Sequence, residues 1–330
     1  MTIKAAHHPG RHCASTGIRN LVNYHRLPWS EALCFGLGAG LGFWYLDLPG
    51  LSPSRLIHVR AADLEERFFN RIGCPFAWER FADPVLAEEA LCERVAAGLP
   101  AIVQTDIYYL PYYRSSTHFP GHLITVWGCD RLKRVFWVTD TEREAVLPVS
   151  FEDMRRARHC RGGIYDLAGN MFGPESLKAP ENMSSVIREA ISFNSRMMLE
   201  DVDGYQGTAA LARWIDAVQT WRDLEDWSWT ARFTYQVIER RGTGGGGFRL
   251  LYADFLQEAA AFYPAVDSAG LRQLMLEAAA AWRELALAFK TASEAQTFKP
   301  ETVSPLIERV YRLELNYHQT VLATLAISRP

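Results

Sequence analysis

The sequence lacks the patterns that identify several specialised classes of protein. None of its six cysteines lies in a C-x-x-C pair, which argues against a structural zinc site and against a disulfide framework. No stretch approaches the roughly 18 consecutive apolar residues of a membrane span. Basic residues form no block, and the nearest approach, residues 155–161, is a short mixed stretch. We therefore expect free thiols, no bound metal, no nucleic-acid partner and no membrane span.

The composition is that of an ordinary soluble globular protein. Of 330 residues, 48% are hydrophobic and 22% are charged, and the formal net charge is -3. The first residues contain histidines and a proline but no basic region followed by an apolar run, so no secretory signal is visible. These features predict a cytoplasmic protein, and the length favours two domains.

The first half of the chain mixes helix and strand patterns. Residues 14–25 have apolar positions three and four apart, which predicts a helix. Residues 31–45 are apolar and rich in glycine, which is typical of a strand or of a tightly packed loop. Further helices are predicted at 62–71 and 84–97, and strands at 101–105, 123–127 and 135–139. We expect an α+β domain over residues 1–165.

After residue 165 the strand patterns largely disappear. The segment 166–180 contains two glycines and two prolines and is typical of a linker. Long amphipathic stretches beyond it predict helices at 183–200, 209–221, 271–290 and 305–326. We expect residues 166–330 to form an all-α helical domain.

Cys13 stands directly before the first predicted helix. A thiolate at a helix N-terminus benefits from the positive end of the helix dipole, which lowers the pKa of the thiol and makes it a better nucleophile at neutral pH. Buried inert thiols are common, so this position alone would not indicate a catalytic residue. A base and an orienting group are also needed.

Two predicted strands supply these partners. We take residues 129–133 as the loop of a hairpin, in which Gly128 pairs with Arg134. The same register sets His122 opposite Asp140, with Cβ atoms roughly 5 Å apart. A carboxylate at that distance would hold the imidazole in one tautomer and stabilise its cationic form. The alternative is that His122 caps a strand and Asp140 begins a turn.

The order of these three residues in the chain favours a papain-like fold. In that arrangement the cysteine opens a helix, and the histidine and the acid lie on adjacent strands of a sheet. Cys13, His122 and Asp140 follow this order. They are therefore the candidate catalytic triad.

Several segments resemble the butirosin biosynthesis protein H family. They are residues 10–13 (GRHC), 30–38 (SEALCFGLG), 40–43 (GLGF), 106–112 (DIYYLPY) and 122–140. In the second half, residues 241–249 (RGTGGGGFR) resemble the helical domain of unknown function that follows in many relatives. As an ordered set that spans nearly the whole chain, these motifs are specific.

The resemblance implies a cysteine-dependent acyltransferase. The family's founding member moves an acyl group from an acyl-carrier-protein thioester to an amine of an aminoglycoside, and its first domain is akin to the cysteine peptidases of bacteriocin exporters. In this chain the resemblance makes Cys13 the nucleophile, His122 the base and then the acid, and Asp140 the orienting group.

The resemblance also implies the partners. The donor would be an acyl carrier protein, through its phosphopantetheine arm, or a small acyl thioester, and the acceptor would be a small-molecule amine. No other cofactor is expected. The alternatives are a cysteine hydrolase (thioesterase, amidase or peptidase), in which water replaces the amine, and a non-catalytic binding protein on a peptidase-like scaffold.

The chain departs from the exporter peptidases before the cysteine. Those enzymes carry a glutamine there, whose amide helps to form the oxyanion hole, whereas this chain has His7 and His8. We expect the N–H of Cys13 to be one oxyanion donor and a histidine N–H to be the second. The departure bears more on peptide hydrolysis than on thioester chemistry, because a thioester has the better leaving group.

Four residues of the first half are candidates for substrate binding. Asp106, with Tyr108 and Tyr109, follows a predicted strand, and its carboxylate would pair with the amine of the acceptor. The alternative is an ordinary strand end with an aromatic cluster. Glu31 is a similar candidate, although an acid beside a serine is also a helix-start pattern.

The second half contributes one candidate, Arg249. It follows the glycine run 244–247, whose backbone N–H groups would cradle a phosphate such as that of a phosphopantetheine arm. The run lacks the ending of a nucleotide-binding P-loop. A simple loop between helices is the alternative.

Overall fold

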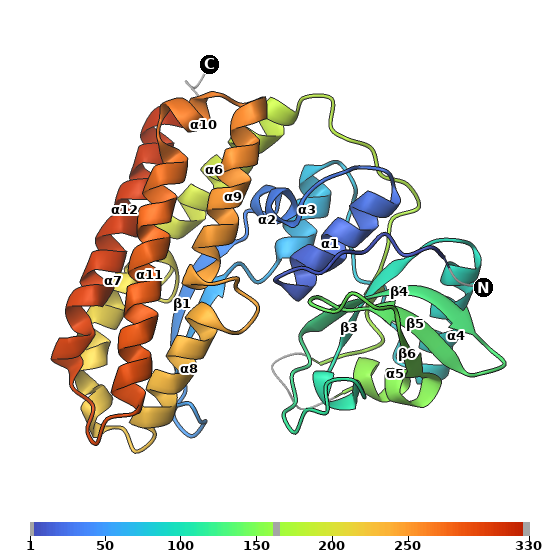
Figure 1. Cartoon of the computed structure of the whole chain (residues 1–330), viewed down its shortest axis with the longest axis horizontal. Helices are drawn as coiled ribbons and strands as arrows, with labels where there is room; N and C mark the ends of the chain where they lie inside the picture. Colours follow the sequence, from blue (N-terminus) through green and yellow to red (C-terminus); the bar gives the residue numbers. More distant parts are fainter. Residues whose placement is uncertain (1–2, 161–165, 326–330) are drawn as a thin grey trace. The chain divides into compact units, whose positions relative to one another are not determined.

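The chain divides into two compact units in the computed structural model, which describes residues 3–160 and 166–325. The described residues form twelve α-helices and two sheets, whose arrangement within each unit can be followed in Figure 1. The first unit comprises Met1–Cys34 and Ile72–Pro180, and the second comprises Phe35–Arg71 and Glu181–Pro330. The α+β class agrees with the sequence analysis. The units do not follow a single division near residue 165, because segment 35–71 belongs to the second unit.

The first unit is built on a five-stranded antiparallel sheet with the strand order β6-β5-β4-β3-β7. Its strands are β3 (Ala101–Thr105), β4 (His122–Asp130), β5 (Val135–Thr139), β6 (Leu147–Ser150) and β7 (Met171–Phe172). Its helices are α1 (Cys13–Tyr24), α4 (Pro84–Ala96), the 3-10 helix η1 (Ile107–Tyr109) and α5 (Phe151–Arg158). Strand β7 lies inside the segment that was predicted to be a linker. That segment is therefore partly an edge strand of the sheet.

Helix α1 packs closely against strands β3 and β4. Gly17 makes this approach possible, since a Cβ at that position would lie 3.0 Å from Cγ2 of Ile102. The buried side chains Ile18, Leu21 and Val22 give α1 the apolar face that the sequence predicted. The sheet thus fixes the position of the helix that begins at Cys13.

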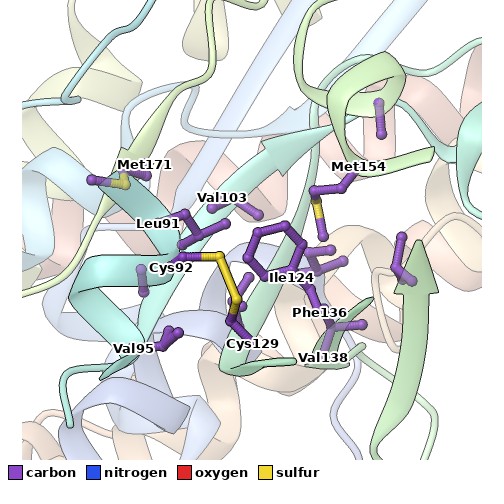
Figure 2. Close-up of a cluster of buried hydrophobic side chains, with 14 of the residues drawn as sticks. Leu91, Cys92, Val95, Val103, Ile124, Cys129, Phe136, Val138, Met154 and Met171 are labelled. Carbon is purple, nitrogen blue, oxygen red and sulfur yellow. A yellow bond between two sulfur atoms is a disulfide. The ribbon is translucent and has the colours of Figure 1, made fainter. Parts of the chain in front are cut away.

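A hydrophobic cluster of the first unit joins helices α4 and α5 to the sheet (Figure 2). Within it, Cys92 of α4 and Cys129 of β4 form a disulfide, with Cα atoms 5.6 Å apart. The prediction that all six cysteines are free thiols is therefore wrong for these two. Their spacing of 37 residues forms no short motif, because packing of the helix on the strand brings them together.

The second unit is mainly helical. Its long helices are α6 (Met183–Leu199), α7 (Gly207–Ala217), α8 (Trp227–Glu239), α9 (Arg249–Phe262), α11 (Leu271–Ser293) and α12 (Ser304–Leu325). Its shorter ones are α3 (Leu64–Arg71), α10 (Ala265–Ser268), η2 (Val218–Asp223), η3 (Gly246–Phe248) and η4 (Pro300–Thr302). The hairpin of β1 (Leu41–Asp47) and β2 (Arg55–Arg60) packs against α7 and α8. Helices α6, α7, α11 and α12 match predicted stretches, whereas α8 and the hairpin were not predicted.

Close aromatic packing explains why segment 35–71 belongs to the helical unit. The ring of Phe35 stacks on Phe248 with centroids 5.1 Å apart. Gly36 lies so near the ring of Phe255 that a Cβ there would come within 2.0 Å of it. Helix α2 (Glu31–Leu37) carries both residues, so residues 31–45 form a helix followed by strand β1 and not one strand or loop.

Candidate functional site

The N-terminus of helix α1 carries the partly exposed Cys13. His12 is the N-cap residue, and its Nδ1 accepts a hydrogen bond from the backbone N–H of Ser15 at 3.4 Å. Gly10 leaves room for the turn before the helix, since a Cβ there would lie 2.0 Å from Oγ1 of Thr16. The first N–H groups of a helix have no partner within it, so the backbone at Cys13 presents unpaired donor positions of the helix end.

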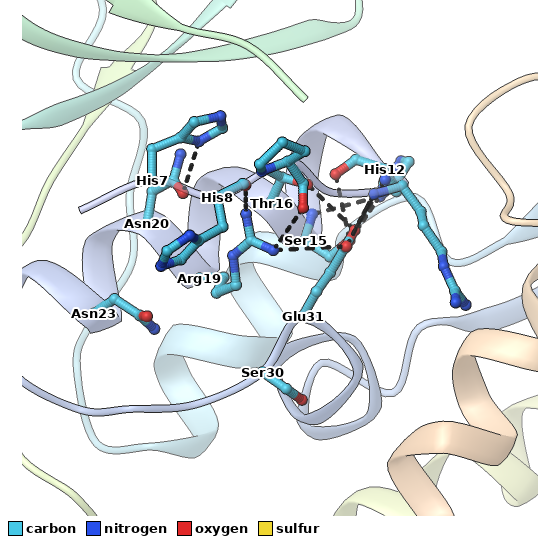
Figure 3. A network of polar contacts seen from close by, with 12 residues as sticks. His7, His8, His12, Ser15, Thr16, Arg19, Asn20, Asn23, Ser30 and Glu31 are labelled. Carbon is cyan, nitrogen blue, oxygen red and sulfur yellow. Dashed lines mark hydrogen bonds and ion pairs between the residues drawn. The ribbon is translucent and has the colours of Figure 1, made fainter. Parts of the chain in front are cut away.

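Glu31 holds the segment before Cys13 in place (Figure 3). Its carboxylate accepts hydrogen bonds from the backbone N–H groups of Arg11 at 2.9 Å and His12 at 2.9 Å. It also accepts from the hydroxyls of Ser15 at 2.8 Å and Thr16 at 3.2 Å. Glu31 is only 8% exposed. All of these contacts are internal, so the carboxylate positions the turn and is not available to a substrate amine.

His122 and Asp140 are in direct contact within the first unit. Nε2 of His122 lies 2.8 Å and 2.9 Å from the two carboxylate oxygens of Asp140. Both side chains are buried, with 6% and 2% exposed. His12 and His122 both act on the thiol of Cys13 and lower its pKa. Since Nε2 is turned to Asp140, Nδ1 is the nitrogen of His122 that is left for the thiol.

The register that led to this pairing is nevertheless wrong. Gly128 pairs with Trp137 and not with Arg134. A bulge between Val126 and Gly128, on the side away from the turn, shifts the register again. The connecting turn occupies residues 131–134. Asp140 therefore follows the end of β5 and reaches His122 from there, while the backbone partner of His122 is Thr105 of β3.

Two tyrosines complete the surroundings of the His122–Asp140 pair, and the sequence analysis did not assign them to the site. The hydroxyl of Tyr112 donates to Oδ2 of Asp140 at 2.8 Å. The hydroxyl of Tyr113 lies 3.2 Å from Nε2 of His122. Thr141 adds a hydroxyl that donates to Oδ1 of Asp140 at 3.1 Å. The position of Tyr112 and Tyr113 in the loop between β3 and β4, which leads to His122, was the sequence signal that could have identified them.

The electrostatics of this cluster favour a thiolate and an imidazolium. Burial alone would raise the pKa of Cys13, but the interactions of its thiol with His12 and His122 lower it well below the usual value. Burial would lower the pKa of His122, but the charge of Asp140 and the hydrogen bonds to it raise that pKa to about 10. Burial is likewise outweighed at Asp140, whose pKa is lowered by the charge of His122.

Neither of the two predicted oxyanion histidines is turned toward Cys13 by its contacts. Nε2 of His7 donates to the carbonyl oxygen of Arg143 at 2.8 Å, and its Nδ1 lies 3.2 Å from Oδ1 of Asn20. Both ring nitrogens of His7 thus face internal groups. His8 is exposed, and its backbone carbonyl accepts a hydrogen bond from Arg19. The predicted role of His7 as an oxyanion donor is therefore wrong, and that of His8 stays a prediction.

Asp106 is fully buried, which is inconsistent with its predicted role of pairing with the amine of an acceptor. Its Oδ1 accepts from the backbone N–H groups of Tyr108 and Phe119, and its Oδ2 lies 2.6 Å from Nδ1 of His118. Tyr108 is 44% exposed and stacks on the ring of His118, whereas Tyr109 packs against the hydrophobic core. The carboxylate therefore orders the loop after β3, and of these predicted residues only Tyr108 presents a large exposed ring.

Asp106, His118 and Cys160 form a second constellation of the same three residue types. Burial raises the pKa of Cys160 to about 11, with a further contribution from its hydrogen bond to Asp106. Such a thiol stays protonated at neutral pH and is a poor nucleophile. Of the two constellations, the one around Cys13 has the chemistry of a nucleophile.

Arg249 lies in the interior of the second unit and is fully buried. Its guanidinium donates to Oε1 of Glu314 at 2.8 Å and to the carbonyl oxygen of Val59 at 3.0 Å. The backbone N–H groups of Gly245 and Gly246 donate to Thr243 and Glu239. This arrangement contradicts the predicted phosphate site, because the arginine and these glycines already bind internal groups.

Replacing Glu31 with glutamine is expected to lower the free energy of unfolding by about 2–3 kcal/mol, because the amide group would turn a donor toward groups that are themselves donors. Chemical denaturation followed by fluorescence measures the effect. Glu152→Gln is the matched control: it removes an exposed ion pair with Arg156 and should change stability by less than about 0.5 kcal/mol. Equal stability of the two variants would show that Glu31 does not hold the turn.

Comparisons with known proteins show which family the chain belongs to. No curated protein matches the chain, and none of its described helices is long and apolar enough to cross a membrane. Residues 12–141 match the family described as butirosin biosynthesis protein H, N-terminal. Residues 152–321 match a domain of unknown function, DUF4872. The first match includes Cys13, His122 and Asp140. The chain therefore belongs to the butirosin biosynthesis protein H family, which implies a role in a biosynthetic pathway.

Proposed function

We propose that this protein is an acyltransferase that uses Cys13 as its nucleophile. The observation that carries the proposal is the direct contact of His122 with Asp140, together with the effect of His122 on Cys13, whose pKa it lowers. A thiol at a helix N-terminus, a base beside it and a carboxylate behind the base are the three parts of an activated nucleophile. Family membership supports a biosynthetic setting for this chemistry.

The proposed reaction has two half-reactions. In the first, the Cys13 thiolate adds to the carbonyl carbon of an acyl thioester, the carbon–sulfur bond of the donor breaks, and protonated His122 gives its proton to the departing thiolate. In the second, an amine attacks acyl-Cys13 while neutral His122 takes its proton. The amide leaves, and the thiolate–imidazolium pair is restored.

The end of helix α1 would also stabilise the tetrahedral intermediates. The N–H groups of Cys13 and Ala14 belong to the first turn, which has no acceptors within the helix. These groups are our candidates for binding the oxyanion. With the antiparallel sheet behind α1, this arrangement supports a papain-like assignment of the first unit.

The acyl donor and the acceptor follow from the family resemblance. An acyl-carrier-protein thioester or a small acyl thioester would be the donor, and a small-molecule amine would be the acceptor. A hydrolase with the same triad is the second candidate, because water can attack acyl-Cys13 in place of the amine. The intact set of Cys13, His122 and Asp140, with His122 and Asp140 in direct contact, argues against a binding protein that has lost its chemistry.

The test is to mix the protein with a panel of acyl thioesters and to record its intact mass. We expect one acyl group per chain, located by peptide mapping at Cys13, and its transfer to an added amine. Release of the free acid regardless of amine would support the hydrolase. Failure of every thioester to acylate a folded protein, under conditions in which Cys13 is readily alkylated, would contradict thioester chemistry.

A further inference from the structure

We propose that Asp106, His118 and Cys160 form a Zn²⁺ site in the first unit. One potential ligand atom from each residue lies within 4.8 Å of the other two. Asp106 follows β3, His118 lies in the loop before β4, and Cys160 follows α5. Because the ligands come from separate segments, no short cysteine motif announces the site.

Neighbouring groups orient two of the three ligands. Oδ1 of Asp106 accepts the backbone N–H groups of Tyr108 at 3.1 Å and Phe119 at 2.8 Å, which directs Oδ2 toward His118. The ring of His118 stacks on Tyr108 with centroids 4.1 Å apart. Partners of this kind fix the direction of carboxylate and imidazole ligands and are a usual part of metal sites.

The set of donor atoms favours Zn²⁺ among common ions. A thiolate, an imidazole and a carboxylate suit zinc, whereas Mg²⁺ and Ca²⁺ prefer sets made only of oxygen. Zn²⁺ binding would release the proton of the Cys160 thiol to solvent, and the resulting thiolate and the carboxylate together balance the charge of the ion. Ligand atoms of tetrahedral zinc lie roughly 3.3–3.8 Å apart, so the His118–Oδ2 separation of 2.6 Å must open. The side chain of His118 is 52% exposed, so the separation can open by a small shift of the ring over Tyr108 toward solvent. Water would take the fourth position.

Occupancy of this site would join the ends of the loop that carries Tyr112 and Tyr113. Asp106 and His118 bracket that loop, and Cys160 connects it to the end of α5. The metal would thus act on the tyrosines that contact Asp140 and His122. Binding of the metal itself does not depend on the acyl transfer proposed for Cys13.

The experiment uses Co²⁺ as a spectroscopic probe and Zn²⁺ as the native ion, with the full-length Cys13→Ala protein. This background removes the other thiol–imidazole pair, which would compete for metal. We expect one equivalent of Co²⁺ with a thiolate-to-cobalt charge-transfer band. Cys160→Ser should abolish the band, His118→Ala should weaken Zn²⁺ binding at least roughly tenfold, and Cys74→Ser should leave both unchanged.

Thermal unfolding provides a second readout. Zn²⁺ should raise the melting temperature of the Cys13→Ala protein but not that of Cys13→Ala/Cys160→Ser, because only the former binds the ion in its folded state. An unchanged metal-free melting temperature in the double variant shows that it still folds. A missing charge-transfer band in excess Co²⁺, or a band that survives Cys160→Ser, overturns the proposal.

Discussion

Replacing Cys13 with alanine is expected to abolish acylation of the protein and to reduce thioester turnover by at least roughly 10³-fold, since loss of a nucleophile removes the whole covalent route. Thioester consumption and intact mass measure the two effects. Cys74→Ala is the matched control, because Cys74 lies in the same unit and burial raises the pKa of its thiol. Full turnover in Cys13→Ala would remove the acyl-enzyme mechanism.

The pH dependence of alkylation tests the same residue without a substrate. The pKa of Cys13 is lowered, so its thiolate persists as the pH falls below about 8.5, the usual cysteine pKa. Alkylation by iodoacetamide should therefore stay fast at neutral pH and slow only in more acidic solution. His122→Ala should move that decline to higher pH. An inflection near the ordinary cysteine pKa in the wild-type protein would contradict the thiolate–imidazolium pair.

Asp140→Asn is expected to lower turnover by about 10³–10⁴-fold while leaving the protein folded. Asp140 supplies the charge that raises the pKa of His122, so its loss lets that pKa fall. Neutral His122 then stabilises the thiolate less, and the pKa of Cys13 rises. The kcat/KM for a thioester and the pH profile of Cys13 alkylation are the measurements.

The control for this variant lies in the same hairpin. Asp130→Asn changes a carboxylate that accepts the backbone N–H groups of Leu132 and Lys133 in the connecting turn. An asparagine oxygen can make the same turn, so turnover should stay near the wild-type value. A similar loss in both variants would mean that hairpin distortion, and not the charge beside His122, controls the rate. Wild-type turnover in Asp140→Asn would remove Asp140 from the mechanism.

Local pattern was sufficient for most elements of the first unit. Helix α1 begins one residue before its predicted start, and β3 and β5 have their predicted ends. The proximity of His122 and Asp140 was also predicted, although for the wrong reason. The assumed register placed the turn at residues 129–133, whereas it occupies residues 131–134. A bulge between Val126 and Gly128, which no simple alternation of side chains reveals, then changes the pairing by one residue. The two residues meet because Asp140 follows its strand and reaches back.

The roles of two predicted site residues depend on contacts between distant segments, which sequence patterns do not reveal. Arg249 beside a glycine run is typical of an anion site. Its guanidinium is instead buried in an ion pair with Glu314, which is distant in the sequence. Glu31 was a candidate for the substrate and instead binds the turn before Cys13. In both cases the residue type was informative and its partner was not predictable from spacing.

The division of the chain has a consequence for its synthesis and for its engineering. The ribosome produces residues 35–71 before most of the first unit, yet their packing partners in the second unit begin only at residue 181. This segment must therefore wait for the C-terminal half before its apolar side chains are covered. A gene cut between the two family matches would leave residues 35–71 on the N-terminal product, separated from their packing partners in the second unit. Swapping modules between relatives should succeed only when residues 35–71 travel with the C-terminal part.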